Sequence, residues 1–506
     1  MSRSIKKITL LLLALRLLRI LLSVITLTVS ADYFGISYKR DLWVLVSTFL
    51  STLSLAIWGP VNETFRTKFI FIKEEKGEKE AVKQTGALIG FVLVVTLMLS
   101  LFIALFSGYL ANYMIALPTS TKVSLFIYLL LLLLPSFLLN ELTTLTISVL
   151  NAYNVYYIPE IVGTVTGVIG LFVIAFLSPS LGIYSLVIAQ YVGGIFLFGV
   201  ILYYLKSLRI PLWNHIRAVR WNRISGFIYF SLPFFFPYFV GQINALTEKF
   251  LAGRLGEGCI SSLDYAHQFT SVLQGVLGSV LLTIMVPMLS KSFSQKRLDE
   301  YATVFREYLS VCFVVLCVVI PLLLGAAQPI CQFFFLRGGV TPEDLSHIIL
   351  ISRLYAFSFI GIVLYMLFGS AALSMGKNKV YAMYGVAAQL FMLVLNLSLY
   401  NKVGIYIFPV SNGIAHFVAM IMIGRNVSVG SRDVCLKISR YVLVIVVISG
   451  VIYGFNALLE PANALLAILF NLLLTIVLLP IALLGAGFDM SFYWKKLLKK
   501  RWLYNE

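Results

Sequence analysis

The chain has 506 residues, of which 60% are hydrophobic, 14% aromatic and only 12% charged, and its mean hydropathy is +0.96. This composition excludes an ordinary water-soluble globular protein. Lys and Arg number 39 against 21 Asp and Glu, a formal net charge of +18. In a soluble protein this excess would favour a nucleic-acid partner, but in a chain this apolar we expect none. The charge must instead serve membrane topology, contact with anionic lipid or an anionic substrate.

Apolar runs of about 20 residues, long enough for a helix to cross the bilayer core, recur along the chain between short polar breaks. They predict an all-α polytopic membrane protein with about fourteen transmembrane helices. The first run is a helix and not a signal peptide, because it carries Arg16 and Arg19 and no small-residue cleavage site follows it. The fourteen runs cover residues 8–29, 42–59, 86–108, 123–150, 158–177, 181–205, 227–246, 263–289, 308–327, 348–373, 381–399, 404–423, 441–459 and 462–484.

The distribution of Lys and Arg over the loops predicts the orientation of the chain. Alternate loops and both termini carry 29 of these residues, the opposite loops carry 7, and Arg16, Arg19 and Arg353 lie within spans. Because cytoplasmic loops are enriched in Lys and Arg, both termini are expected in the cytoplasm. Topology therefore accounts for most of the +18 charge.

A basic break after the sixth span divides the first twelve helices into two lobes of six. We expect an N-terminal lobe (1–205), a basic cytoplasmic linker (206–226), a C-terminal lobe (227–424), two further helices (425–485) and a basic amphipathic tail (486–506) on the anionic inner leaflet. A weak repeat supports parallel halves, because a Gly lies six residues before an Asp at Gly35 and Asp41, and again at Gly258 and Asp264.

No motif of an enzyme occurs in the chain. A Gly-rich phosphate loop and a His-Glu-x-x-His pattern are both missing, and the sequence holds only four histidines. We therefore expect no catalytic residue, metal or cofactor. Ionisable residues within spans are the informative ones, because each is costly in the membrane and marks a pathway by default.

Arg16 and Arg19 are the first such residues. They lie three apart and therefore on one face of the first helix. Facing a wet cavity, their two guanidinium groups would bind a phosphate-type anion. Alternatively, both side chains reach the cytoplasmic interface and serve no substrate.

Glu141 is the one acidic residue deep within a predicted span, beside Asn140 and Thr143. It is a candidate counter-charge for the arginines, a candidate proton or sodium site, or one partner of a structural hydrogen bond between helices. At the outer turn after the seventh span, either an ion-pair network at the rim or a gate is formed by Glu248, Lys249, Asp264 and His267.

Two stretches resemble the MurJ/MviN family of lipid II flippases. "LGEGCISSLDYAHQFTSVLQGVLGSVLLTIMVPMLSKSF" (255–293) matches their seventh-to-eighth helix region, and "FFFLRGGVTPEDLSHIILISRLYAFSFIG" (333–361) resembles their Thr-x-x-Asp loop and the opening of helix ten. The segment "YFGISYKRDLWVLVSTF" resembles the turn after helix one, with Asp41 at the usual acidic position and hence a further gate candidate.

The resemblance implies a MATE-like fold of the multidrug/oligosaccharidyl-lipid/polysaccharide exporter superfamily, in the bacterial inner membrane. It implies a flippase that moves an undecaprenyl-pyrophosphate-linked saccharide, with no cofactor and with coupling to Na⁺, H⁺ or the membrane potential. The chain departs from the family pattern where Gln268 replaces an expected Arg in helix eight, and where the stretch 23–27 lacks an Arg-Asp pair. A related lipid-linked oligosaccharide is therefore an alternative substrate.

We predict that Arg16 and Arg19 bind the pyrophosphate, while Gln242, Asn244, Gln268 and Gln274 contact the saccharide. The partners expected are this polyprenyl-linked saccharide and anionic lipids, and the chain is expected to be a monomer. Two alternative functions are a cation-coupled multidrug antiporter of the same superfamily, with Glu141 as its coupling site, and a membrane scaffold that binds neither ligand.

Overall fold

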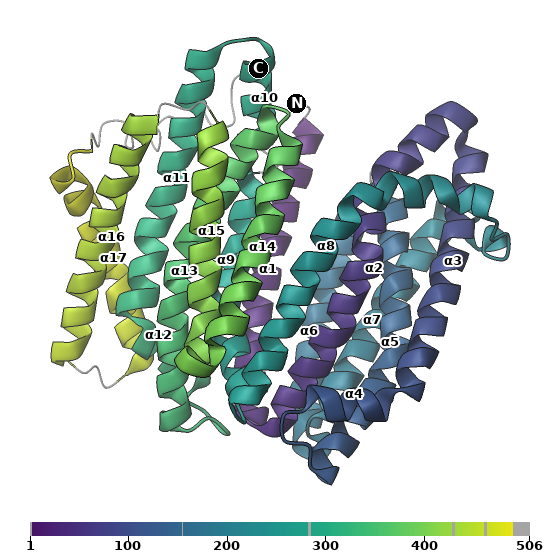
Figure 1. The fold of residues 1–506 in the computed structure, drawn as a ribbon, viewed down its shortest axis with the longest axis horizontal. Coiled ribbons are helices and arrows are strands. Elements are labelled where there is room, and N and C mark those ends of the chain that lie inside the picture. Colours follow the sequence, from purple (N-terminus) through teal and green to yellow (C-terminus); the bar gives the residue numbers. More distant parts are fainter. Residues whose placement is uncertain (1–2, 154, 282–284, 428–430, 460–462, 489–506) are drawn as a thin grey trace. The chain divides into compact units, whose positions relative to one another are not determined.

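A computed structural model describes residues 3–153, 155–281, 285–427, 431–459 and 463–488. All regular structure in these ranges is helical, and Figure 1 shows long helices joined by short turns. The elements are α1 (Arg3–Phe34), α2 (Tyr38–Lys76), α3 (Glu78–Leu105), α4 (Ser107–Met114), α5 (Ser120–Ala152), α6 (Tyr157–Leu181), α7 (Tyr184–Ser207), η1 (Leu212–His215), α8 (Trp221–Leu255), α9 (Cys259–Val280), α10 (Val286–Ser294), α11 (Leu298–Gly325), α12 (Ala327–Phe335), α13 (Pro342–Ser374), α14 (Asn378–Val403), η3 (Gly404–Tyr406), α15 (Ile407–Asn426), α16 (Ser431–Leu459) and α17 (Ala464–Gly485).

Each predicted span lies on one or two of these helices. Within the described ranges, eleven helical segments are long and apolar enough to cross a membrane, and one of them, Asn378–Asn426, covers two predicted spans. In α1 the described residues Leu21–Phe34 form a shorter apolar helical segment. The prediction of an all-α polytopic membrane protein is confirmed. The predicted amphipathic tail (486–506) lies almost entirely outside the described residues.

The chain divides into two compact units, residues 1–261 and 262–506. The boundary falls in the first turn of α9, so the whole of α8 belongs to the first unit. The division predicted from the sequence lies earlier, in the basic segment 206–226. The lobe boundaries and the separate role of the last two helices stay predictions.

In the first unit, α2 packs against α3, α5 and α8, while α6 packs against α1 and α7. Large buried aromatic rings hold α2 to its neighbours. The ring of Phe65 stacks on that of Phe227 with 5.4 Å between centroids, and the indole N–H of Trp58 donates to the hydroxyl of Thr96 at 3.1 Å. The indole is thus buried with its polar atom satisfied, as a tryptophan inside a membrane protein requires.

The stretch between the second and third predicted spans is helical. Helices α2 and α3 extend beyond their apolar parts and reverse direction at one residue, Gly77, whose φ of +84° suits glycine. The amine of Lys73 lies 3.2 Å from the carboxylate of Glu78, which also accepts a 2.7 Å hydrogen bond from the hydroxyl of Tyr153. These contacts tie the charged end of the α2–α3 hairpin to the end of α5.

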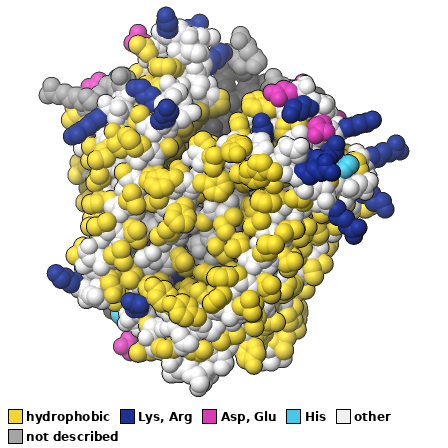
Figure 2. Space-filling model, turned by 45° about the vertical axis from the view of Figure 1, so that its right-hand side comes forward, with side chains coloured by type: hydrophobic (Ala, Val, Ile, Leu, Met, Phe, Trp, Pro, Cys, Tyr) yellow, Lys and Arg dark blue, Asp and Glu magenta, His cyan; other side chains and the backbone are white. Residues whose placement is uncertain are grey.

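The basic segment between α7 and α8 packs onto α3 through two glycines. A Cβ at Gly90 would lie 2.0 Å from the carbonyl oxygen of Ile216, and one at Gly86 would lie 2.6 Å from that of Leu212. The backbone of the segment therefore lies directly on α3, as small residues permit in helix packing. The exposed basic residues of this segment are Lys206, Arg209, Arg217 and Arg220. Figure 2 shows most Lys and Arg side chains of its view toward the top, with hydrophobic side chains covering much of the surface below them.

In the second unit, α13 and α15 approach so closely that glycines are required. A Cβ at Gly361 would lie 2.9 Å from the carbonyl oxygen of Gly413, and one at Gly413 would lie 3.0 Å from Cα of Ser358. Helices α16 and α17 are joined by Asn456 and Asn471, whose side-chain amides exchange hydrogen bonds of 3.1 and 3.0 Å. Polar contacts of this kind hold helices together where lipid offers no hydrophobic driving force.

Candidate functional site

The carboxylate of Asp41, predicted as a gate candidate, is buried at the start of α2 and binds the turn between α8 and α9. It accepts hydrogen bonds from the backbone N–H of Gly258 at 2.6 Å, from the backbone N–H of Ser261 at 2.8 Å and from the hydroxyl of Ser261 at 2.5 Å. A carboxylate placed on the free N–H groups of a first helical turn is favourable electrostatically. Asp41 therefore caps α9 from a different helix.

Gly258 is required at this turn for two reasons. Its φ is +84°, and a Cβ there would lie 2.2 Å from Cγ2 of Ile36. Gly258 and Asp41 belong to separate copies of the weak sequence repeat. The structure brings the Gly of one copy onto the Asp of the other, and that contact was missed because 217 residues separate them.

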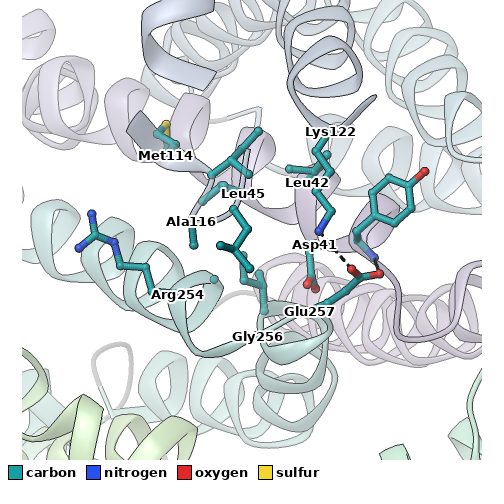
Figure 3. Close-up of a pocket in the computed structure, with 14 residues that line it drawn as sticks. Asp41, Leu42, Leu45, Met114, Ala116, Lys122, Arg254, Gly256 and Glu257 are labelled. Carbon is teal, nitrogen blue, oxygen red and sulfur yellow. Dashed lines mark hydrogen bonds and ion pairs between the residues drawn. The ribbon is translucent and has the colours of Figure 1, made fainter. Parts of the chain in front are cut away.

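A second carboxylate, that of Glu257, holds the same turn against the starts of α2 and α5. It lies 3.2 Å from the amine of Lys122 at the start of α5, and it accepts a 3.2 Å hydrogen bond from the backbone N–H of Tyr38. Figure 3 shows Lys122 pointing toward Asp41 and Glu257, whereas the guanidinium of Arg254 points away from them. Lys122 and Glu257 were not predicted as site residues, since neither lies within a predicted span.

These side chains border a pocket of about 80 Å³ that also has Leu42, Leu45 and Met114 in its wall. Pockets for small molecules are usually about 300–1,000 Å³. The pocket is therefore too small for a saccharide or a lipid head group. Its charged groups hold the α8–α9 turn in place by ion pairing and capping.

A larger cavity of about 690 Å³ lies among the α1–α2 turn, the start of α5 and the α6–α7 turn. Aromatic rings of Tyr33, Tyr128 and Tyr184 line it together with the amine-bearing side chain of Lys39 and the hydroxyl of Ser37. Its volume lies within the usual range of small-molecule sites, and its wall offers aromatic rings, hydroxyls and an amine. None of the sequence-predicted site residues lines it, because its residues come from turns and helix ends.

Arg19, one of the two predicted anion-binding residues, forms an ion pair with Glu160 at the start of α6. Its guanidinium lies 3.0 Å from the carboxylate and donates a 3.1 Å hydrogen bond to the backbone carbonyl of the same residue. The side chain of Arg19 is 44% exposed and that of Glu160 is 22% exposed. A Cβ at Gly163 would lie 2.4 Å from the guanidinium, so only glycine leaves room for this pose. The Arg16 side chain lies outside the described residues.

Glu141 is buried in the middle of α5 and accepts a hydrogen bond from the hydroxyl of Ser54 on α2. The counter-charge reading would require an arginine beside it. Arg19 instead pairs with Glu160 in this structure, and the described residues give Glu141 no ion pair. Its contact with Ser54 is a hydrogen bond between helices, and the counter-charge and cation-site readings of Glu141 stay predictions.

The remaining predicted residues are spread over both units. In the first unit, Glu248 pairs with its neighbour Lys249 at 3.2 Å, Asn244 is buried, and Gln242 is half-buried on another face of α8. In the second unit, the ring of His267 lies 4.9 Å from that of Tyr355, and the three other predicted residues on α9 are half-buried: Asp264, Gln268 and Gln274.

The sequence family described as "Lipid II flippase MurJ" matches residues 30–474. One curated relative, the lipid II flippase MurJ of Burkholderia cenocepacia, is 28% identical over 235 residues, which is 46% of this chain and 46% of that protein. The matched part of the chain thus spans less than half the length of this relative.

Two solved structures share the fold. A lipid II flippase MurJ in an inward closed conformation gives a TM-score of 0.77 at 19% identity, covering 97% of this chain and 99% of that chain. An inward-facing multidrug resistance MATE family transporter of the MOP superfamily gives 0.67 at 12% identity, covering 83% and 95%. The prediction of a MATE-like fold is confirmed.

Proposed function

Because the chain belongs to the MurJ family of lipid II flippases, whose match covers residues 30–474, we propose that it flips a polyprenyl-pyrophosphate-linked saccharide across the membrane by alternating access. The family match is the observation that carries this proposal. Lipid II is the substrate that the family name supplies. The chain works as a multi-pass transporter and not as an enzyme, and we place it in the bacterial inner membrane with both termini in the cytoplasm.

The pyrophosphate is assigned to Arg16 and Arg19 on α1. Guanidinium groups bind phosphate oxygens through paired N–H donors, and the exposure of Arg19 leaves its group accessible to such a ligand. In the described conformation the Glu160 carboxylate forms an ion pair with the Arg19 guanidinium. The anionic head group therefore has to displace the Glu160 carboxylate from Arg19 when it binds.

The saccharide is assigned to Gln242, Asn244, Gln268 and Gln274, with the groove bordered by Tyr33, Tyr128 and Tyr184 as a second contact region. The polyprenyl tail stays in lipid. Gln268 stands where the family usually carries an arginine, which removes one cation from the head-group site. This departure favours a second candidate substrate, a related lipid-linked oligosaccharide with fewer anionic groups than lipid II.

Asp41, Glu248, Asp264 and His267 are assigned to gating at the outer side. The support comes from Asp41, because its three hydrogen bonds fasten the α8–α9 turn, where the chain passes from one compact unit to the next. Opening of a gate here requires these bonds to break together.

Transport into proteoliposomes with a fluorescent polyprenyl-pyrophosphate saccharide tests the proposal. We expect the wild-type chain to move the substrate and the Arg16→Ala, Arg19→Ala double variant to lose at least tenfold in rate, with an Asp32→Asn variant as the control. Undiminished transport by a folded double variant would contradict the anion site. Binding of a lipophilic cation in place of the saccharide would favour the antiporter, and binding of neither would favour the scaffold. Native mass spectrometry of the same samples tests the expected monomer and its anionic lipids.

A further inference from the structure

Glu141 is the buried acidic group that the proposed flipping cycle does not use. It lies in the middle of the 33-residue helix α5, its side chain is 1% exposed, and it faces α2. One carboxyl oxygen meets the hydroxyl of Ser54. A charged carboxylate at such a position requires a cation or several donors to offset its lost hydration.

Donors for a charged carboxylate are scarce at this position. Among the residues that the structure describes, no donor reaches the second oxygen, Oε2, of Glu141. The neighbouring hydroxyls on the same helix point elsewhere, since Thr143 donates to the carbonyl of Leu139 at 2.7 Å and Thr146 to that of Leu142 at 2.8 Å. One hydroxyl partner is far fewer than the two or three donors that stabilise a buried carboxylate.

Charged groups are also distant along the helices that pack most closely on α5, namely α2, α3, α4 and α7. On α2 the nearest ionisable residues to Ser54 are Glu63, nine residues on, and Asp41, thirteen residues before, or about 13 and 20 Å along a helix. On α3, charges end at Lys83. The ionisable residues of α4 are tyrosines, and those of α7 are tyrosines and, near the end of the helix, Lys206. Tyr191 of α7 donates to the carbonyl of Leu132 at 2.6 Å and not to Glu141.

From this arrangement we propose that Glu141 is a proton-binding site, occupied by a proton in the described conformation and emptied in another state of the transport cycle. The acid form is neutral and needs no cation, and the hydroxyl of Ser54, which donates to the charged carboxylate, can accept from the acid O–H in its place. A metal cation would need several oxygen ligands at once, and the described part of the chain holds no group of three or more His, Cys, Asp or Glu that could bind a metal ion.

The site couples transport to protons if the carboxyl takes up a proton from water on one side of the membrane and releases it to water on the other. This inference rests on the proposed flippase function. Movement of α2 relative to α5 would break the contact with Ser54 and admit water, and water stabilises the charged form. The carboxyl is therefore protonated in one state of the transport cycle and charged in the other.

A transport assay under a pH gradient tests the coupling. With one proton per substrate, a difference of one pH unit shifts the steady-state substrate ratio across the membrane about tenfold. We expect this shift in the wild type and in Glu75→Gln, which removes an exposed carboxyl near the end of α2. In Glu141→Gln the amide mimics the protonated acid permanently, so the ratio should not respond to the gradient while facilitated flipping persists.

Infrared difference spectroscopy of the purified protein supplies a readout independent of transport. A carboxylic-acid C=O band should be present in the wild type at neutral pH, shift in Ser54→Ala, and be lost in Glu141→Gln. The Glu141→Asp variant, which keeps the carboxyl, guards against a folding defect in the Gln variant. A gradient response that survives in Glu141→Gln would overturn the proposal, as would a sodium-dependent and pH-independent response in the wild type. Flipping without any gradient response would overturn the coupling and leave the proposed function intact.

Discussion

The carboxylate of Asp41 on α2 accepts two hydrogen bonds from Ser261 on α9, one from the backbone N–H at 2.8 Å and one from the hydroxyl at 2.5 Å. The first turn of α9 is thus capped by a residue that lies 220 positions earlier in the chain. In most helices the capping side chain is local. Here the cap doubles as a tertiary link, so its removal should affect both the helix end and the packing of α2.

Replacing Asp41 by Asn should destabilise the protein. The amide retains one acceptor oxygen and places an NH₂ group against donors, so at least one backbone N–H loses its partner. We expect the free energy of unfolding to fall by about 2 kcal/mol. Thermal unfolding in detergent, followed by intrinsic fluorescence, measures this loss. Asp32→Asn on the exposed face of α1 serves as the control, and equal melting temperatures for the two variants would refute the cap.

The glycine that accompanies this cap can be tested against a matched glycine elsewhere. Gly258 and Gly77 both have a φ of +84°, but a Cβ at Gly258 would meet Ile36 at 2.2 Å, whereas nothing lies within 4 Å at Gly77. Both changes to Ala impose backbone strain of about 1–3 kcal/mol. Gly258→Ala should cost more than Gly77→Ala by the steric clash. Equal losses in urea-induced unfolding of the two variants would show that the turn has room to adjust.

The ion pair between Arg19 and Glu160 is expected to lower the affinity of the protein for a pyrophosphate substrate. If the pyrophosphate displaces the Glu160 carboxylate from Arg19, then Glu160→Gln should remove this competition and tighten binding of a polyprenyl pyrophosphate, by about threefold to tenfold. Arg19→Gln should weaken it. Microscale thermophoresis with a labelled polyprenyl pyrophosphate measures both constants. Weaker binding by Glu160→Gln would instead mean that the pair orients Arg19 for the substrate.

The attachment of the basic segment to α3 is open to a proteolysis test. Gly90→Ala would bring a Cβ within 2.0 Å of the Ile216 carbonyl and should push the segment off the helix. Trypsin should then cleave after the exposed Arg217 and Arg220 several-fold faster than in the wild type. Gly108→Ala is the matched control, since nothing lies within 4 Å of a Cβ there. Unchanged cleavage of Gly90→Ala would mean that the segment is not held by this contact.

The sequence predicted the helices well, and it placed their ends poorly. Hydropathy marks the part of a helix that suits lipid, so it could not show that α2 continues to Lys76 or that α3 starts at Glu78. Beyond the membrane a helix persists through its hydrogen bonds and through contacts such as Lys73 with Glu78. Those contacts depend on the geometry of the turn at Gly77, and hydropathy along the sequence contains no information about that geometry.

The candidate site was predictable only in part. Glu141 stood out in the sequence because an acid within an apolar span is costly wherever it points. Asp41 was singled out through the weak repeat and the family resemblance. Gly258 was noticed only as a member of that repeat, and Ser261, Glu257 and Lys122 were not identified. Pairings across more than 100 residues depend on how helices pack, and periodicity along one helix carries no information about its neighbour.

The sequence by itself determined that this chain is an all-helical membrane protein and that most of its positive charge lies in alternate loops, because lipid penalises every unpaired polar group and charge in a span. Tertiary structure alone decided the partners of the few polar groups that remain. It assigned Arg19 to Glu160, Asp41 to the α9 turn and Glu141 to a single hydroxyl of Ser54. The physical reason is that hydrogen bonds and ion pairs act over a few ångströms, and only the packing of distant segments brings such groups within that range.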